Sequence, residues 1–236
     1  MLADHLPTSA TSFVGRDAEL ASIAALLADP ACRLLSLIGV GGIGKTRLAL
    51  RTDSEQLPRF ADGVYFVGLA AISSPDLIAS AIASTLDLIL YGPEDPKPQL
   101  TAYLREKQML LILDNLEHLL GGIDLLSDLL HAAPSVKILA TSRERLNLQE
   151  EWLIALDGLW VPEADTRGTL ENYSAVTLFV QRARQIQAGF SLSENAKAVK
   201  TICQQLEGLP LGLELADHQN RVSHCQDRFL IATSRR

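Results

Sequence analysis

Residues 34–46 read LLSLIGVGGIGKT, and the second part of this stretch, from Gly39 to Thr46, fits the pattern G-x-x-x-x-G-K-[ST]. The pattern describes a loop whose backbone N–H groups surround a phosphate. The residues before it, Leu34 to Ile38, form an apolar run of the length of a buried strand, and a helix is expected after the loop. This order is the one that phosphate binding requires, and it favours a phosphate-binding loop over a glycine-rich turn with a solvated lysine.

The residue types of this loop suit a bound nucleoside phosphate. Glycine permits the backbone to wrap around the anion, and the N-terminus of the following helix adds unpaired N–H donors and the positive end of its dipole. Lys45 is expected to place its charge on the β- and γ-phosphates of ATP or ADP, and Thr46 to supply a hydroxyl ligand to Mg²⁺. The residues of this segment expected to contact the nucleotide are Gly39, Gly41, Gly42, Ile43, Gly44, Lys45, Thr46 and Arg47.

Four further apolar runs follow and alternate with helical patterns. Short apolar runs separated by helices predict a parallel α/β sheet. We therefore expect the three-layer αβα fold of P-loop NTPases with a five-stranded parallel sheet, followed by a partial small helical domain. After the third run, Leu119, Ile123, Leu126 and Leu130 recur on one stripe and predict a helix. The five expected strands are Leu34 to Ile38, Gly63 to Leu69, Met109 to Leu113, Val136 to Ala140 and Trp152 to Leu156.

The strand signal stops before a linker-like segment at residues 159–169, which contains proline and mixed charges. Beyond it, Ser174 and Ser193 are predicted to cap two amphipathic helices. Gly208 is predicted to end the second of these helices, and Pro210 to begin a third. We therefore expect a P-loop nucleotide-binding domain over residues 1–158, a partial helical lid domain over residues 159–216 and a polar tail over residues 217–236.

An acidic residue ends the third apolar run. Asp114 follows Leu110 to Leu113, so it is expected at the carboxyl edge of the sheet, where ligands bind in folds of this class. A nucleoside triphosphate site needs a carboxylate at the end of a neighbouring strand to hold Mg²⁺ through water. An Asp after a strand also serves as a helix cap, but the phosphate loop earlier in the chain favours the metal-binding role for Asp114.

The residues after this Asp argue for slow hydrolysis. Vigorous ATPases place an acid directly after the metal-binding Asp, whereas this chain has Asn115, which cannot accept a proton from water. The sequence leaves two readings of Glu117 open: a general base, if the chain turns inward, or a first-turn residue that favours the helix dipole. His118 is expected to be a surface or packing residue of that helix.

Arg143 follows the fourth run at the same edge of the sheet. If its strand lies next to the strand of the phosphate loop, the guanidinium can reach a γ-phosphate bidentately. The alternative is a solvated arginine within the sequence Arg143-Glu144-Arg145. We expect the first role, and therefore predict that Arg143 distinguishes ATP from ADP.

The charge and cysteine content exclude several functions. Lys and Arg total 21 against 28 Asp and Glu, and the formal charge of −7 disfavours direct contact with nucleic acid or anionic lipid. The three cysteines show no zinc-site or disulfide spacing, and no signal peptide or membrane-spanning run is evident. A cytoplasmic location is therefore expected.

Taken together, these motifs resemble those of the signal-transducing STAND ATPases of the NB-ARC type, in the form found in bacterial transcriptional regulators. The resemblance covers about residues 12–216, and all motifs occur in the family's order and spacing. It is therefore much more specific than a phosphate loop alone. Besides the loop, the matching segments are Phe13-Val14-Gly15-Arg16 with Glu19, Leu113-Asp114-Asn115 with Glu117-His118, Ala140-Thr141-Ser142-Arg143 and Gly208-Leu209-Pro210-Leu211.

The resemblance implies a nucleotide-dependent switch. Val14, Arg16 and Pro210 would border the adenine and ribose, and Arg143 would sense the γ-phosphate. ADP would hold a closed monomer, and exchange for ATP would allow opening, oligomerisation and contact with protein partners. Few residues precede the first motif, and the helical domain stops soon after Leu211. We therefore expect a switch core without input or output domains, from a shortened gene product or one with an altered C-terminus.

Three functions remain open at this point. The first is an ADP/ATP-binding regulatory module that is also a weak Mg²⁺-dependent ATPase. The second is an interaction module that binds nucleotide without useful turnover, which Asn115 favours. The third, a small-molecule phosphotransferase, is weaker because no Arg-rich lid or acceptor-binding segment is found. The expected catalytic residues are Lys45, Asp114, Glu117 and Arg143, and the expected metal ligands are Thr46 and Asp114.

Overall fold

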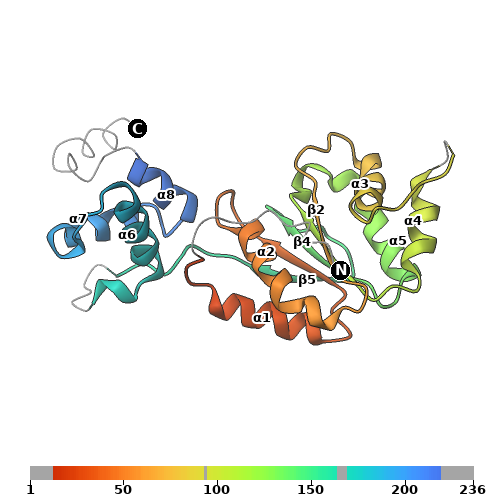
Figure 1. Ribbon diagram of the computed structural model, residues 1–236, viewed down its shortest axis with the longest axis horizontal. Coiled ribbons are helices and arrows are strands. Elements are labelled where there is room, and N and C mark those ends of the chain that lie inside the picture. Colours follow the sequence, from red (N-terminus) through yellow and green to blue (C-terminus); the bar gives the residue numbers. More distant parts are fainter. Residues whose placement is uncertain (1–12, 93–94, 164–168, 219–236) are drawn as a thin grey trace. The chain divides into compact units, whose positions relative to one another are not determined.

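The computed structural model of the chain describes residues 13–92, 95–163 and 169–218 (Figure 1). The described residues divide into two compact units. The first unit comprises residues 17–41 and 45–156 and contains the sheet. The second comprises residues 13–16, 42–44 and the described residues from 157 onward, and contains the C-terminal helices.

The first unit is built on a five-stranded parallel sheet with the order β2-β3-β4-β1-β5. The three inner strands β3, β4 and β1 are almost entirely buried, since helices cover both faces of the sheet. The five predicted strands and the predicted fold class are confirmed. The strands are β1 (Leu34–Ile38), β2 (Val64–Gly68), β3 (Leu110–Asp114), β4 (Lys137–Ser142) and β5 (Glu151–Ala155).

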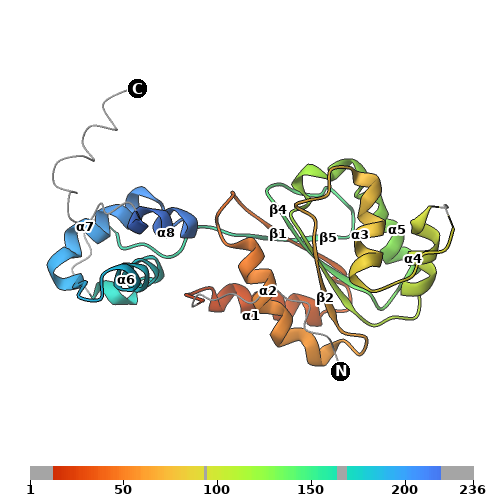
Figure 2. The ribbon, with the colours of Figure 1, turned by 45° about the horizontal axis from the view of Figure 1, so that its top comes forward.

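Helices lie in two layers around this sheet (Figures 1 and 2). On one side are α1 (Asp17–Ala28) and α2 (Lys45–Gln56), and on the other are α3 (Ile78–Thr85), α4 (Pro96–Leu104) and α5 (Asp124–Ala132). The apolar side chains of the second layer form one continuous core with residues of β1 to β4. Short 3₁₀ turns occupy Leu57–Arg59, Pro75–Leu77, Leu116–His118 and Leu120–Gly122.

The strand order corrects one expectation about the site. Asp114 was expected on a strand next to the phosphate-loop strand, but β4 lies between β3 and β1. The expectation that the strand of Arg143 lies next to the phosphate-loop strand is confirmed, because β4 pairs with β1. The apolar periodicity of single segments carries no information about strand order, which depends on pairing between distant segments.

The helix after β3 begins later than its apolar stripe suggested. Leu119, Leu126 and Leu130 are buried as predicted, and Ile123 packs against the same core. The segment before Asp124 nevertheless forms 3₁₀ turns rather than an α-helix. Two consecutive glycines in that segment lower its helical propensity, so the α-helix starts only after them.

The second unit contains α6 (Ser174–Ile186), α7 (Leu192–Gln205) and α8 (Pro210–His218), after a 3₁₀ turn at Leu170–Asn172. A core of their apolar side chains, including the fully buried Phe179, holds them together. Gly208 has a φ of +67° after the end of α7, and Pro210 begins α8, as predicted. Helix α8 runs through the first two residues of the expected polar tail, and the remainder of that tail lies outside the described residues.

The two predicted serine caps are wrong. Ser174 is the first residue of α6 rather than the residue before it, and its hydroxyl accepts the backbone N–H of Trp160 (2.9 Å). Ser193 lies inside α7, whose N-cap position is Ser191, without a side-chain capping bond. Among the described residues, no helix is long and apolar enough to cross a membrane.

Candidate functional site

The glycine-rich loop connects β1 directly to α2, as its sequence predicts. Gly42 and Gly44 have φ values of +79° and +98°, a region that residues with a Cβ rarely adopt. The loop therefore takes a backbone path that only glycine follows without strain. Lys45 begins α2, which places the loop at the helix N-terminus, where anions bind.

Lys45 is folded onto the loop that precedes it. Its Nζ donates hydrogen bonds to the carbonyl oxygens of Gly39 (2.7 Å) and Val40 (3.1 Å), and the residue is only 9% exposed. Burial lowers the pKa of this amine, and the negative charge of Glu117 opposes that effect. The ammonium group is thus a partly desolvated charge inside the loop, which suits the binding of an oxyanion.

Thr46 and Asp114 meet at the expected metal site. The Thr46 hydroxyl donates to Oδ1 of Asp114 at 2.7 Å, although the two residues are 68 positions apart in the chain. A hydroxyl and a carboxylate are the hard oxygen ligands that Mg²⁺ uses, directly or through water, beside the phosphates of a substrate. The residues present therefore fit Mg²⁺.

Thr141, to which the sequence assigned no role, also contacts Asp114. Thr141 of β4 is only 1% exposed, and its hydroxyl lies 2.6 Å from the same Asp114 oxygen. In the sequence, Thr141 stands out only as part of the segment Ala140-Thr141-Ser142-Arg143. The signal that would have found it is the parallel register, since the pairing of Leu113 with Ala140 makes Asp114 and Thr141 the next pair.

Glu117 and Arg143 are brought together at the same edge of the sheet. Nε of Arg143 lies 2.9 Å from Oε1 of Glu117, and the two side chains are 67% and 15% exposed. Oε2 of Glu117 is buried and has no hydrogen-bond partner among the described residues. A Cβ built on Gly41 would lie 3.7–3.9 Å from the Arg143 guanidinium, which therefore rests over the phosphate loop.

The side chain of Asn115 contacts His118. The Asn115 backbone is left-handed, with a φ of +71°, and the side-chain amide lies 3.3 Å from Nδ1 of His118. The other ring nitrogen of His118 lies 2.8 Å from the carbonyl oxygen of Ile72, and the residue is exposed. His118 therefore links two loops at the surface, as its predicted surface role implies.

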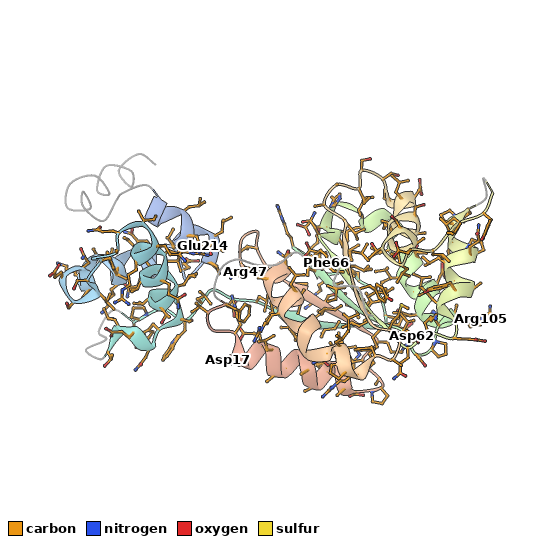
Figure 3. The ribbon with its side chains drawn as sticks, in the orientation of Figure 1. Asp17, Arg47, Asp62, Phe66, Arg105 and Glu214 are labelled. Atoms are coloured by element: carbon orange, nitrogen blue, oxygen red, sulfur yellow. The ribbon has the colours of Figure 1, made fainter. Side chains whose placement is uncertain are left out.

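Val14, Arg16 and Pro210 belong to the second unit, together with loop residues 42–44. Within that unit, the Arg16 guanidinium donates to the carbonyl oxygens of Ile43 (3.2 Å) and Asp157. Arg47 lies in the first turn of α2 in the first unit (Figure 3). The geometry thus joins Lys45, Thr46, Asp114, Glu117 and Arg143 in the first unit.

Comparison with known sequences identifies longer relatives. The chain is 37% identical over 186 residues to Rv0890c of Mycobacterium tuberculosis (strain ATCC 25618 / H37Rv), whose name assigns it provisionally to the HTH-type transcriptional regulators. That match covers 78% of this chain and 20% of the relative. A second match, Rv0894 of the same strain, is 35% identical over 208 residues and covers 87% of this chain and 50% of the relative. The chain thus spans between a fifth and a half of these relatives.

Solved structures with the same fold include P-loop ATPases. A STAND protein with a tetratricopeptide repeat sensor, PH0952 from Pyrococcus horikoshii, superposes with a TM-score of 0.52 at 20% identity, covering 88% of this chain and 30% of that one. Cdc6p from Pyrobaculum aerophilum superposes with a TM-score of 0.60 at 16% identity, covering 94% of this chain and 65% of that one. At these identities the likeness concerns the fold alone.

The family model that matches is AAA_22, described as "AAA domain", and it spans residues 29–148. This range includes the glycine-rich loop, Asp114 at the end of β3, and Arg143 directly after β4. The match, the parallel sheet and the loop geometry agree with one another. The chain therefore belongs to the AAA domain family, and it is a nucleotide-binding module of the P-loop ATPase class.

Proposed function

We propose that the chain is an ADP/ATP-binding switch module of the STAND class and NB-ARC type, with slow Mg²⁺-dependent ATP hydrolysis. The observation that carries this proposal is the 2.7 Å hydrogen bond between the Thr46 hydroxyl and the Asp114 carboxylate. It joins the phosphate loop to the acidic end of β3, and these are the two parts that a Mg²⁺-nucleotide site needs. The transcriptional-regulator name of one relative and the STAND neighbour support the class.

The loop and Lys45 would hold the phosphates. Backbone N–H groups at the start of α2 face an anion favourably, and Lys45 would exchange its two carbonyl contacts for phosphate oxygens. Thr46 and Asp114 would hold Mg²⁺, directly or through water. When bound, Mg²⁺ neutralises the charge that develops on the phosphate oxygens.

Glu117 is the residue that we propose as general base. Its buried Oε2 offers an acceptor for a water proton, and Arg143 on Oε1 holds the carboxylate at the loop until the γ-phosphate takes over the guanidinium. In the hydrolysis step, the water oxygen bonds to the γ-phosphorus and its proton passes to Glu117. The bond between the γ-phosphorus and the bridging oxygen breaks, which yields ADP and inorganic phosphate.

The switch function rests on the family resemblance. Val14, Arg16 and Pro210 would contact the adenine and ribose. Residues 1–158 would form the nucleotide-binding domain, and residues 159–216 part of a lid. ADP would favour a monomer, and ATP an oligomer that contacts protein partners in the cytoplasm.

A nucleotide-dependent interaction module without turnover is the second candidate. It is favoured by Asn115, which stands where vigorous ATPases have an acid and whose side-chain amide lies 3.3 Å from Nδ1 of His118. In this case Glu117 would serve only as the partner of Arg143.

Three measurements on the full chain separate these functions. Calorimetric titration with ADP in Mg²⁺ tests nucleotide binding, and mass spectrometry of the purified protein tests for retained ADP. Phosphate release from ATP then tests turnover, with Glu117→Gln expected to lower it by about 100-fold or more. Binding with no phosphate release would favour the second candidate, and the absence of any binding would refute both.

A further inference from the structure

Thr141 occupies the position between the phosphate loop and Asp114. Strand β4 lies between β1 and β3, and the parallel register sets Thr141 beside Asp114 on one flank and beside Leu37 on the other. Successive side chains of a strand point to opposite faces. Leu113 and Ala140 belong to the core beneath α3, α4 and α5, so the residues that follow them point to the face covered by α2.

The hydrogen bonds of Thr141 define the direction of its proton. The backbone N–H of Asn115 donates to Oγ1 of Thr141 at 2.9 Å. The same hydroxyl lies 2.6 Å from Oδ1 of Asp114, and an ionised carboxylate only accepts. The hydroxyl therefore accepts from the backbone and donates its single proton to Asp114.

Two hydroxyl protons consequently converge on one carboxylate oxygen. Thr46 donates to Oδ1 of Asp114 from α2, and Thr141 donates to it from β4. Hydrogen bonds to a charged acceptor are short and strong, so two of them hold the carboxylate in one orientation. Its other oxygen, Oδ2, is then the one available to Mg²⁺ or to a water bound to it.

We infer that Thr141 is a positioning residue, which sets the affinity of the site for Mg²⁺ through the orientation of Asp114. The inference rests on the proposed nucleotide-binding function and deepens it. Partners that orient a metal ligand typically account for about 10- to 100-fold in metal affinity. The role needs the hydroxyl of Thr141 and not merely its volume. Serine at this position should therefore preserve the Mg²⁺ affinity, and valine should not.

The experiment compares ADP affinity in excess Mg²⁺ and in EDTA for the wild-type chain and four variants. Thr141→Val keeps the shape and removes the hydroxyl, and Thr141→Ser keeps the hydroxyl. Thr141→Ala is a second variant without the hydroxyl, which is used if the valine variant does not fold. Thr52→Val is the matched control, because Thr52 is equally buried at 1% exposure but donates to the carbonyl of Leu48 within α2.

The quantity compared is the gain in ADP affinity that Mg²⁺ confers. We expect this gain to fall by about 10- to 100-fold in Thr141→Val or Thr141→Ala. It should stay within about 3-fold of wild type in Thr141→Ser, and Thr52→Val should retain it even where its melting temperature falls. A merely structural role would lower affinity equally in both buffers.

Three results would overturn the inference. The first is an unchanged gain in ADP affinity from Mg²⁺ in the variants that lack the hydroxyl. The second is a serine variant that loses as much of this gain as the valine variant does. The third is a wild-type chain whose ADP affinity is indifferent to Mg²⁺. If the wild-type chain binds no ADP in either buffer, the proposed function fails as well, whereas the first two results refute only the role of Thr141.

Discussion

Replacing Arg143 by alanine should weaken ATP binding and leave ADP binding almost unchanged. The guanidinium rests over Gly41 of the phosphate loop and is held at 2.9 Å by Glu117. ADP has no γ-phosphate for this guanidinium to contact. We therefore expect the side chain to respond to ATP and not to ADP.

The magnitude follows from two opposing contacts. A charge-assisted hydrogen bond to the γ-phosphate is worth about 1.5–3 kcal/mol. ATP must first draw Arg143 from Glu117, and because Arg143 is 67% exposed, that ion pair is worth only about 0.2–1 kcal/mol. The net loss for ATP in Arg143→Ala is then about 0.5–2.8 kcal/mol, or roughly 2- to 100-fold in affinity.

Glu117→Gln removes the ion pair that competes with the γ-phosphate for Arg143. The neutral amide keeps the shape of the side chain but releases the guanidinium. ATP affinity should then rise by about 0.2–1 kcal/mol, roughly 1.4- to 5-fold, with ADP affinity unchanged. The two variants thus shift the ratio of ATP to ADP affinity in opposite directions.

Calorimetric titrations with ADP and with a non-hydrolysable ATP analogue measure both affinities on each variant. Arg145→Ala is the matched control, since it removes a second exposed arginine two residues further along the same segment. Equal losses for both nucleotides in Arg143→Ala would mean that Arg143 supports the loop rather than the γ-phosphate. No loss of affinity for either nucleotide would mean that Arg143 is a solvated surface residue, and would refute the proposed contact with the γ-phosphate.

Further expectations concern the loop, the buried thiols and one surface ion pair. Lys45→Ala should weaken ADP by about 1.5–3 kcal/mol, roughly 10- to 150-fold by calorimetry, and wild-type affinity would contradict the loop assignment. Burial raises the pKa of the thiols of Cys32 to about 11 and of Cys203 to about 12, so both should resist alkylation until their unit unfolds. Mass spectrometry after pulsed labelling should also show that ADP protects Cys32, because ADP at 100 times its dissociation constant adds about 2.7 kcal/mol of stability. The pKa of Asp62 (labelled in Figure 3) is lowered by the hydrogen bond from the backbone N–H of Gln108 and, to a smaller extent, by the amine of Lys107. The ionised Asp62 carboxylate therefore stabilises the fold above its unfolded pKa, and this stabilisation is lost as the pH falls through its folded pKa. Asp62→Asn should therefore cost about 0.5–1 kcal/mol in urea unfolding at neutral pH and nothing below the folded pKa, and a pH-independent difference would refute this origin.

The residues that sequence reasoning placed well share local patterns. The five strands are short apolar runs, and the phosphate loop has a spacing that is typical of a strand-loop-helix unit. Asp114 was located because an acid at the end of a buried strand stands at the carboxyl edge whatever the strand order is. The serine caps failed because a helix start depends on backbone dihedrals within one residue, which a single polar side chain does not specify.

The sequence by itself determined the fold class, the phosphate loop and the candidate acid at the sheet edge, because each is carried by residues close together in the chain. Only the tertiary structure decided that β4 separates β3 from β1, and hence that Thr141 stands beside Asp114. It also decided that Glu117 pairs with Arg143. Strand order and side-chain pairing depend on contacts between segments that are distant in the chain. The apolar periodicity of one segment does not specify which other segments lie beside it.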